Sequence, residues 1–395
     1  MNPLMARLNP YPFEKLRDLT EGVTPADFPP VAWSIGEPKH AAPGFLQPTL
    51  AEHLGGFSNY PTTTGLPELR LAISQWCNRR FQLGDKGLDA DKAVLPVTGT
   101  REALFAIVQA LFDARSSKRD VWMPNPFYQI YEGATLLAGG EPRYLPCLVE
   151  NDYQPDYEAL SDADWDNCQM LFLCTPGNPS GTPLTLNQLT RLVNKARAHN
   201  VLLISDECYS ELYRDENQPP PGLLQACATV SPGDFSQCLV FHSLSKRSNL
   251  PGLRSGFVAG DSDLIAEFLR YRTYHGCAMP IPHQHVSIAA WQDEQHVATN
   301  RALYNQKYEA VESILGDKIP IRIPAASFYL WPNLERDDEQ VAVDWLARAN
   351  IRVLPGQYLG RTIDGLNPGY GHVRIALVAE LEACIDAAER LRALL

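Results

Sequence analysis

The middle of the chain, from about Ala93 to Gly260, alternates short apolar runs with segments of helical periodicity. In these runs consecutive residues, and not only alternate ones, are apolar, which is typical of strands buried on both faces of a mostly parallel sheet. They are AVLPV, DVWMP, QMLFLCTP, VLLISD, CLVFHS and SGFVAG. Apolar residues recur at helical spacing between them, in REALFAIVQALFDAR, PFYQIYEGATLLAGG and TLNQLTRLVNKARAHN. This alternation predicts a large α/β domain in which crossover helices flank the sheet.

The pattern changes after about Pro282. A long helical stretch, HVSIAAWQDEQHVATNRALYNQKYEAVESIL, leads to the short strand-like runs IRIP, FYLWP, RVLPG and VRIALV and to a final helix from Glu380 to Leu395. This order is typical of a smaller α+β domain, which the N-terminal segment completes. We therefore predict a large domain over 41–283 and a small domain over 1–40 plus 284–395, with a hinge near Gln284.

The length and charge of the chain limit its partners. The 395 residues are enough for two domains. The chain has 34 Lys and Arg against 46 Asp and Glu, a formal charge of −12. Because there is no basic surplus to neutralise phosphates, nucleic acid and anionic membranes are not expected as partners. Local arginines or lysines must hold any anionic substrate.

The sequence points to a cytoplasmic protein. The first residues contain prolines and charges but no apolar stretch of signal-peptide length. The apolar run VLLIS, residues 201–205, is far too short to span a bilayer. The nine cysteines include no CxxC pair, so we expect reduced thiols and neither a disulfide framework nor a metal site.

The strongest chemical motif is SLSKRSNLPGLRSGF, residues 243–257, directly after the strand-like run CLVFH. Lys246 lies between serines at a strand end, and Arg254 follows eight residues later. Lys246 is suited to form a Schiff base with a phosphorylated aldehyde, whose phosphate Arg254 would bind bidentately. For an isolated S-x-x-K motif, however, a solvated loop lysine is the more frequent explanation.

Three further motifs strengthen the first. VLLISDECY ends a buried strand in Asp206 and places Tyr209 three residues later, so a carboxylate and a phenol lie at one strand end. CTPGNPSG carries Asn178 after another strand, and VTGTREAL opens a helix at 99–101, where free backbone N–H groups can bind phosphate. Each motif alone has an ordinary structural explanation as a turn or a helix cap. All four follow strands, however, and the loops at strand ends carry the ligand in open α/β sheets.

With these motifs the chain resembles the class I aminotransferases of the aspartate aminotransferase fold, which use pyridoxal 5′-phosphate (PLP). The resemblance extends from IGEP at Ile35 to HVRIAL at His372. It implies the PLP-dependent transferase fold, with a large domain of mostly parallel sheet flanked by helices and a smaller α+β domain. It also implies amino-acid and keto-acid substrates and a homodimer.

The resemblance assigns roles residue by residue. The implied catalytic residues are Lys246, Asp206 and Tyr209. The implied cofactor-binding residues are Gly99, Thr100, Arg101, Tyr128, Asn178, Asp206, Tyr209, Ser243, Lys246 and Arg254, with Tyr60 reaching the phosphate of the neighbouring subunit. The implied substrate-binding residues are Gly36, Asn178 and Arg374, of which Arg374 binds the α-carboxylate. The resemblance also implies a cis Asn178–Pro179 bond. Phe328 is either a wall of the substrate pocket or an ordinary half-buried strand aromatic.

Several stretches are similar to the succinyldiaminopimelate aminotransferases: NPYPFEKLR, WSIGEPKH, SDECYSELY, FHSLSKRSNLPGLRSGFVAGD and YHGCAMP. The implied reaction converts N-succinyl-L,L-diaminopimelate and 2-oxoglutarate into N-succinyl-2-amino-6-oxopimelate and glutamate, in lysine biosynthesis. The alternatives are a broader aminotransferase (for aspartate, aromatic amino acids or acetylornithine), a PLP-dependent carbon–sulfur lyase, and a PLP-binding regulator.

The extra carboxylates of that substrate require further cations in the pocket. Arg17, Lys39, Arg247 and Arg272 lie near the motifs in sequence and are the candidates. Our hypothesis is that at least one of Arg17, Lys39 and Arg272 binds a distal carboxylate, although a solvated surface charge is the more frequent role of such residues.

Overall fold

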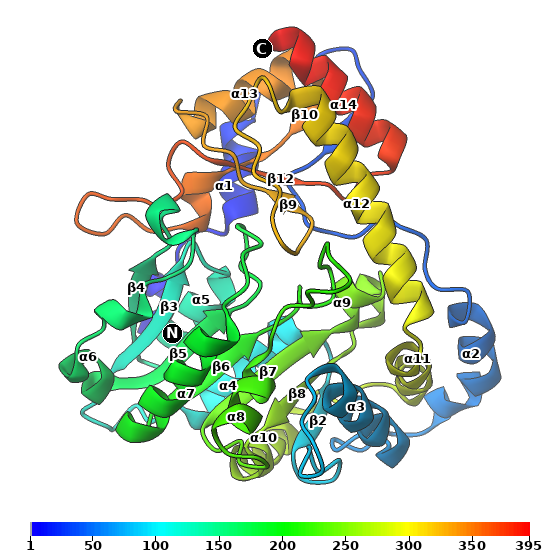
Figure 1. Ribbon diagram of the computed structural model, residues 1–395, viewed down its shortest axis with the longest axis vertical. Coiled ribbons are helices and arrows are strands. Elements are labelled where there is room, and N and C mark those ends of the chain that lie inside the picture. Colours follow the sequence, from blue (N-terminus) through cyan, green and yellow to red (C-terminus); the bar gives the residue numbers. More distant parts are fainter. Residues whose placement is uncertain (1) are drawn as a thin grey trace.

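The computed structural model describes residues 2–395 and has at its centre a sheet in the order β2-β8-β7-β6-β5-β3-β4 (Figure 1). The strands are β2 (Val94–Val97), β3 (Asp120–Asn125), β4 (Glu141–Pro146), β5 (Cys168–Cys174), β6 (Leu202–Asp206), β7 (Cys238–Ser243) and β8 (Gly256–Gly260). All neighbouring strands are parallel except β8, which runs antiparallel to both β2 and β7. The expected mostly parallel sheet is confirmed.

Helices cover both faces of this sheet. The helices of this part of the molecule are α2 (Leu46–His53), α3 (Pro67–Arg80), α4 (Thr100–Leu111), α5 (Gln129–Leu137), α6 (Asp162–Asn167), α7 (Leu186–His199), α8 (Leu223–Val230), α9 (Leu244–Arg247), α10 (Ser262–His275) and α11 (Ile281–Gln292). Helices α3, α7, α8 and α11 share one buried apolar cluster with the sheet, and α4, α5 and α10 share another. The predicted crossover helices therefore form where the apolar spacing of the sequence placed them.

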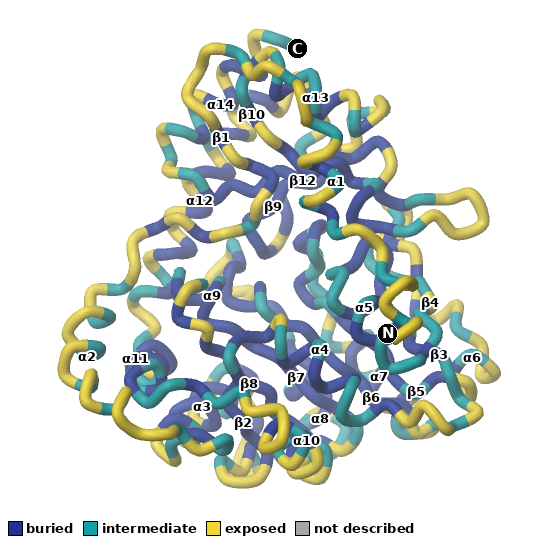
Figure 2. Tube along the Cα trace, turned by 180° about the vertical axis from the view of Figure 1, so that it is seen from behind, coloured by how far each residue is buried: buried dark blue, intermediate teal, exposed yellow. Residues whose placement is uncertain are grey.

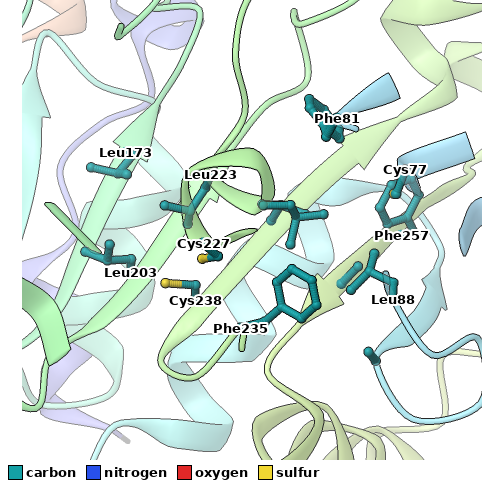
Figure 3. Packing of buried hydrophobic residues seen from close by; sticks show 14 of the residues in the cluster. Cys77, Phe81, Leu88, Leu173, Leu203, Leu223, Cys227, Phe235, Cys238 and Phe257 are labelled. Atoms are coloured by element: carbon teal, nitrogen blue, oxygen red, sulfur yellow. The ribbon is translucent and has the colours of Figure 1, made fainter. Parts of the chain in front are cut away.

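Alternate residues of the strands supply the two clusters. Leu203 packs in the first cluster and Ile204 in the second, because successive side chains of a strand point to opposite faces. Figure 3 shows part of the first cluster, where Leu203 of β6 and Leu173 of β5 lie close to Leu223 of α8. Figure 2 shows the same strands as a buried layer beneath more exposed helices and loops.

A smaller body lies above the large one in Figure 1. Its three-stranded antiparallel sheet has the order β11-β12-β9, and a parallel pair joins β1 to β10. Its elements are β1 (Val31–Ala32), β9 (Tyr329–Leu330), β10 (Ile351–Arg352), β11 (Leu354–Pro355), β12 (Val373–Ala376), α1 (Pro12–Leu19), α12 (Gln295–Leu315), α13 (Asp338–Ala349) and α14 (Leu381–Leu394). A separate apolar cluster fills the smaller body, and its largest side chains are those of Trp33 and Trp345. The short 3₁₀ helices of the chain are η1 (Pro3–Arg7), η2 (Leu54–Ser58), η3 (Val149–Asn151), η4 (Tyr157–Ala159), η5 (Pro251–Leu253) and η6 (Gly356–Leu359).

Two local features differ from expectation. The helical stretch expected over 285–315 is helical but divided into two helices, because Asp293 adopts an extended backbone (φ −104°, ψ 124°) between α11 and α12. The Asp293 carboxylate accepts hydrogen bonds from the backbone N–H and the ring of His296, which favours this break. IRIP, residues 321–324, pairs with no strand and forms a loop. The final helix is present as α14.

The connection between the two bodies lies near the start of α12. Val286, Ala290 and Trp291 of α11 pack in the same cluster as α3, whereas α12 runs on to pack against α14 (Figure 1). The packing therefore favours a domain boundary after α11, although the division at Gln284 remains a prediction. Within residues 2–395, no helix has both the length and the apolar character needed to cross a membrane.

Candidate active site

A pocket of about 540 Å³ lies between the two bodies. It is lined by these sequence-predicted residues: Gly36, Thr100, Arg101, Tyr128, Asn178, Asp206, Tyr209, Ser243, Lys246, Arg254 and Arg374. Asn178, Asp206 and Lys246 follow or end the neighbouring strands β5, β6 and β7, whose carboxyl ends meet at one edge of the sheet. The large sheet therefore brings together motifs that are far apart in sequence.

Lys246 lies in α9, a single helical turn that directly follows β7. The Ser243 side chain accepts a hydrogen bond from the Ser245 backbone N–H and so caps this turn. The Lys246 Nζ donates to the Gly36 carbonyl oxygen at 2.5 Å. Burial lowers the pKa of Lys246 to about 8, because the apolar surroundings disfavour the charged amine. A neutral amine, the nucleophilic form, is therefore accessible near neutral pH.

Asp206 ends β6 and is buried beneath the pocket. Its carboxylate accepts hydrogen bonds from the Tyr131 hydroxyl at 2.7 Å and from the Cys208 backbone N–H at 3.2 Å. Burial raises the pKa of Asp206, while these hydrogen bonds oppose the rise. Within residues 2–395, the Asp206 carboxylate forms no ion pair with a lysine or an arginine. A protonated ring nitrogen above it would supply the missing positive partner.

The motif predicted to bind phosphate lies at the start of α4. Gly99 has φ +94°, and α4 has no side-chain cap, so the first N–H groups of the helix are available to an anion. A Cβ on Gly99 would lie 2.2 Å from Nη2 of Arg254, so only glycine lets the guanidinium approach the helix terminus this closely. Together with the Ser243 and Ser245 side chains in the pocket wall, this arrangement suits a phosphate group.

Arg374 comes from β12 in the small body. Its Nη2 donates to the Ser34 carbonyl oxygen at 2.8 Å and its Nη1 to Oδ1 of Asn178 at 3.2 Å. Its Nε is buried and has no hydrogen-bond partner within residues 2–395. An arginine held on one side by the protein, with a buried donor unused, can bind a carboxylate.

Tyr209 and Tyr329 join the two halves of the pocket. Their hydroxyl groups lie 3.0 Å apart, and the Tyr329 ring packs 4.5 Å from the Arg374 guanidinium. Burial raises the pKa of Tyr209, and the Tyr329 hydroxyl adds to the rise, so the phenol stays protonated and can donate. A Cβ at Gly36 would lie 2.0 Å from the Tyr329 hydroxyl, so glycine is required at this position.

The sequence analysis missed five tyrosine and cysteine residues of the site. Tyr11, Cys174, Cys208 and Tyr329 line the pocket, and Tyr131 holds Asp206 from behind. Tyr11 and Cys208 lie inside stretches already singled out, and Tyr329 directly follows Phe328. Phe328 is fully buried, and its ring lies 5.5 Å from Nζ of Lys246 without lining the pocket.

Two predicted site residues lie outside the pocket wall. Gly99 supports the wall through its close approach to Arg254. Tyr60 is 101% exposed and does not line the pocket, so its role toward a partner subunit remains a prediction. The expected cis bond at Asn178–Pro179 is present.

The structure argues against two of the cations suggested for distal carboxylates. Arg272 is buried, and its Nη1 donates to both carboxylate oxygens of Glu102, at 2.8 and 2.9 Å. Arg247 is also buried and donates to the Ala290 carbonyl oxygen and to Glu294. Both guanidinium groups are therefore already neutralised inside the protein.

The two remaining candidates also have partners outside the main pocket. Lys39 forms an exposed ion pair with Glu37. Arg17 pairs with Asp18, and both line a separate surface cavity. Neither residue lines the pocket that contains Lys246.

The pocket contains a suitable protein group for each part of PLP. A nucleophilic lysine suits its aldehyde, a buried unpaired carboxylate suits its pyridine nitrogen, and a helix terminus with an arginine suits its phosphate. The residues for these contacts are Lys246, Asp206 and Arg254, and all three line one pocket.

Comparisons with known proteins agree with this fold. The structure superimposes on an aminotransferase from Neisseria meningitidis with a TM-score of 0.94 and 46% identity over 100% of both chains. An LL-diaminopimelate aminotransferase from Maridesulfovibrio salexigens is 29% identical over 98% of this chain and 97% of its own length. A probable N-succinyldiaminopimelate aminotransferase from Thermus thermophilus has a TM-score of 0.82 at 26% identity and covers 97% of this chain and 99% of that chain.

A family model, aminotransferase class I and II, matches residues 29–391. This span includes both bodies and every pocket residue discussed above except Tyr11. The chain therefore belongs to the class I and II aminotransferases, with the aspartate aminotransferase-like fold and pyridoxal 5′-phosphate as its cofactor.

Proposed function

We propose that this aminotransferase converts N-succinyl-L,L-diaminopimelate and 2-oxoglutarate into N-succinyl-2-amino-6-oxopimelate and glutamate. The observation that carries the reaction type is the convergence of Lys246, Asp206, Arg254 and Arg374 on one pocket. The choice of substrate draws on relatives named for diaminopimelate and for its N-succinyl derivative.

Each of these side chains has a distinct part in the reaction. Bound PLP supplies an electron sink for the bonds at the substrate Cα. Arg374 binds the α-carboxylate with its planar fork and so determines which Cα bond faces Lys246. Burial lowers the pKa of the Lys246 amine to about 8. This amine would accept the proton from the substrate Cα and donate it to the cofactor carbon.

The remaining site residues hold the cofactor in place. Asp206 pairs with the pyridine nitrogen and keeps it protonated, while Tyr131 orients the carboxylate. Arg254 and the first turn of α4 bind the phosphate. Tyr209 and Asn178 donate toward the phenolic oxygen of the cofactor ring, as the family resemblance implies.

A second candidate is direct action on LL-diaminopimelate, because the relative from Maridesulfovibrio salexigens carries that name. The two substrates differ in charge at the distal nitrogen. LL-diaminopimelate has a distal ammonium group, whereas the succinyl group replaces this charge with an amide and adds a carboxylate. Among the described residues that line the pocket, Asp206 is the one carboxylate, and it lies beneath the cofactor. A pocket so short of anions favours the succinylated substrate.

The experiment is a substrate comparison with the purified holoenzyme. Glutamate formation from 2-oxoglutarate would be followed with N-succinyl-L,L-diaminopimelate, LL-diaminopimelate, aspartate, phenylalanine and N-acetylornithine as amino donors. We expect the highest kcat/KM for the succinylated donor and no turnover by Lys246→Ala. A higher kcat/KM for LL-diaminopimelate would replace the first candidate with the second. Equal rates with aspartate or phenylalanine would indicate a broad aminotransferase.

We also propose that the active protein is a homodimer, in which Tyr60 of each subunit reaches the other site. The support is the full exposure of the Tyr60 side chain on an isolated subunit, together with the family resemblance.

A further inference from the structure

A buried polar network outside the pocket ends at the backbone of Lys246. Its side chains are those of His40, in the loop after β1, and of Asn300 and Lys307 on α12. Their exposed fractions are 8%, 3% and 1%, and none of the three lines the pocket. Burial of polar and charged side chains costs free energy unless hydrogen bonds satisfy them. The contacts of each member therefore show what the network holds in place.

Asn300 joins the network to the helical turn of Lys246. Its Nδ2 donates to the Lys246 carbonyl oxygen at 3.3 Å and to the Arg247 carbonyl oxygen at 3.5 Å. Its Oδ1 accepts hydrogen bonds from the His40 ring at 2.6 Å and from Asn249 at 2.9 Å. The two carbonyl groups lie at the end of α9, which has only four residues and no following turn to supply their donors. Asn300 supplies a donor in place of that missing turn.

The hydrogen bonds of His40 require its neutral form. Because Asn300 presents its oxygen to the ring, Nδ1 of His40 is the donor in that contact and Nε2 remains an acceptor. Lys307 donates to this acceptor from a distance of 2.6 Å, and its Nζ also lies 3.5 Å from the Val378 carbonyl oxygen. A proton on Nε2 would point at the Lys307 ammonium group. Protonation of His40 therefore breaks the contact with Lys307.

The surroundings of His40 favour the neutral ring. Burial lowers the pKa of His40 from its ordinary value of 6.5, and the Lys307 ammonium group adds to this, while the hydrogen bond at Nδ1 and the exposed Glu380 oppose it. The Tyr304 ring of α12 packs 4.4 Å from the imidazole. Burial also lowers the pKa of Lys307, an effect that Cys384 and Glu380 oppose. The network is therefore intact at neutral pH and loses its contact between the ring and the ammonium group as the solution is acidified.

The segment that carries His40 also contacts the other end of Lys246. Gly36, four residues before His40, accepts a hydrogen bond from Nζ of Lys246 at 2.5 Å. The lysine is thus held at its amine by this segment and at its backbone by Asn300. His40 ties the segment to α12, the helix that runs from the large body into the small one (Figure 1).

We propose that neutral His40 positions Lys246 through Asn300, and that acidification weakens this hold. His40 is a positioning residue, because it touches neither the cofactor pocket nor the substrate and acts through its neighbours. The inference rests on the anchoring role that the proposed function gives to Lys246. It does not depend on which amino acid is the substrate.

The test compares how tightly the cofactor-free protein binds PLP and pyridoxamine 5′-phosphate. Both ligands have the ring and the phosphate, but PLP alone has the aldehyde that can bond to Lys246. We define the PLP preference as the dissociation constant of pyridoxamine 5′-phosphate divided by that of PLP. Poor placement of Lys246 lowers the PLP preference, whereas a general disturbance of the pocket weakens both ligands alike.

The variants remove one part of the network at a time. Asn300→Ala removes the donor to the Lys246 carbonyl oxygen, and His40→Asn removes the titrating ring but keeps an amide nitrogen near the position of Nδ1. The matched control is Asn305→Ala, which changes another asparagine of α12, whose side chain donates to the Arg214 carbonyl oxygen at 3.2 Å. Thermal unfolding of every variant records its stability.

Near neutral pH we expect Asn300→Ala to lower the PLP preference about tenfold, since it loses hydrogen bonds to the turn of Lys246. His40→Asn should keep most of the preference, and Asn305→Ala should keep all of it. An unchanged PLP preference in Asn300→Ala would overturn the proposal. If Asn300→Ala binds neither ligand, its site is unfolded and the pH dependence below decides.

The pH dependence tests the titration of His40. Between about pH 7 and pH 5 the PLP preference of the unaltered protein should fall more steeply than that of His40→Asn, because only the unaltered protein has a titrating ring at this position. Any fall that comes from Lys246 itself is common to both proteins. Parallel profiles would show that protonation of His40 does not reach Lys246 and would contradict the proposal.

Lys246→Ala separates this inference from the proposed function. If Lys246→Ala keeps the PLP preference, Lys246 is not the anchor and the proposed reaction loses its central residue. If Lys246→Ala abolishes the preference but Asn300→Ala keeps it, the anchor stands and the positioning role of the network is wrong.

Discussion

At the scale of single residues, Lys246 must be a nucleophile at a pH where an ordinary lysine is protonated. Burial lowers its pKa to about 8, which leaves a usable fraction of neutral amine near neutral pH. We expect the rate at which cofactor-free protein captures PLP to rise about tenfold per pH unit below pH 8 and to level off above it. Stopped-flow absorbance of the lysine-bound cofactor measures this rate.

The capture rate rises with pH because the neutral amine of Lys246 is the form that reacts. The lowered pKa means that the neutral amine appears at a lower pH than in a solvent-exposed lysine, whose pKa is about 10.4. A capture rate that continues to rise to pH 10 would show that burial does not activate Lys246. Lys195→Ala, which removes an exposed lysine of α7, serves as the control and should keep the same profile.

We expect Tyr131 to act on the cofactor through Asp206. Its hydroxyl donates to the carboxylate at 2.7 Å and opposes the rise in pKa that burial causes. Removing the donor in Tyr131→Phe should raise the pKa of Asp206 further. Because the reaction needs the ionised carboxylate, activity should then be lost at a higher pH as the solution is acidified. We also expect kcat to fall about tenfold, since a hydrogen bond to a charged group contributes about 1.5–3 kcal/mol.

The pH–rate profile of Tyr131→Phe distinguishes this role from simple packing. A structural role alone would lower stability without moving the acidic limb of the profile. Tyr157→Phe, which changes a buried tyrosine of the large core outside the pocket, is the matched control. An acidic limb that moves equally in both variants, or in neither, would contradict the positioning role.

The sequence predicted the residues that lie within motifs but not those that reach the site from elsewhere. Lys246, Asp206, Asn178 and Arg254 follow strands, so a pattern rule could place them together. Tyr131 carries no such mark, because its contact with Asp206 depends on how α5 packs on the sheet. For the same reason Arg272 resembled a free cation in sequence, although in the structure it is buried against Glu102.

At the scale of elements, the start of α4 depends on a glycine for two separate reasons. Gly99 has φ +94°, and its missing Cβ leaves room for Arg254. Its ψ of 150° places it in a region that is essentially restricted to glycine, so we expect Gly99→Ala to cost about 1–3 kcal/mol of stability from backbone strain. We also expect the affinity for PLP to fall by a factor on the order of 100, because Arg254 must move away from the phosphate site. Thermal unfolding and equilibrium dialysis measure the two effects.

Gly84→Ala separates the two contributions. Gly84 also has a positive φ, +72°, but nothing lies within 4 Å of the position of its Cβ. The control should therefore lose stability but keep its affinity for PLP. Equal losses of PLP affinity in both variants would mean that strain, and not the contact with Arg254, sets the affinity.

The elements that the sequence predicted well are those with a clear pattern of apolar residues. The strands of the large sheet are apolar on both faces, and α4, α5 and α7 have regular apolar spacing. The break between α11 and α12 was missed because it depends on the local hydrogen bonds between the Asp293 carboxylate and His296, within a continuous helical pattern. IRIP reads as a strand by composition but has no strand to pair with.

At the scale of the whole molecule, the pocket is incomplete in either body alone. Arg374 of the small body contacts Asn178 of the large body, and Lys246 contacts Gly36. A change in the relative position of the two bodies would therefore alter substrate and cofactor contacts together. The sequence located both halves of this site but not the residues, such as Tyr329, that join them.

Tyr60 tests whether the site needs a second subunit as well. Its side chain is fully exposed on the isolated chain, as a residue that reaches into a partner must be. We expect a homodimer of about 88 kDa, twice the 44.0 kDa of one chain, by light scattering. In Tyr60→Phe the affinity for PLP should fall about tenfold, because one hydrogen bond to a charged phosphate is lost.

Mixed dimers make this prediction specific. Lys246→Ala and Tyr60→Ala subunits, each weak alone, should recover activity when they are unfolded, mixed and refolded together. In the mixed dimer one of the two sites has both an intact Lys246 and an intact Tyr60 from its partner. Tyr274→Phe, which changes another exposed tyrosine, should keep its affinity for PLP and serves as the control. If Tyr60 acted within its own subunit, each mixed dimer would have two damaged sites and no activity would return.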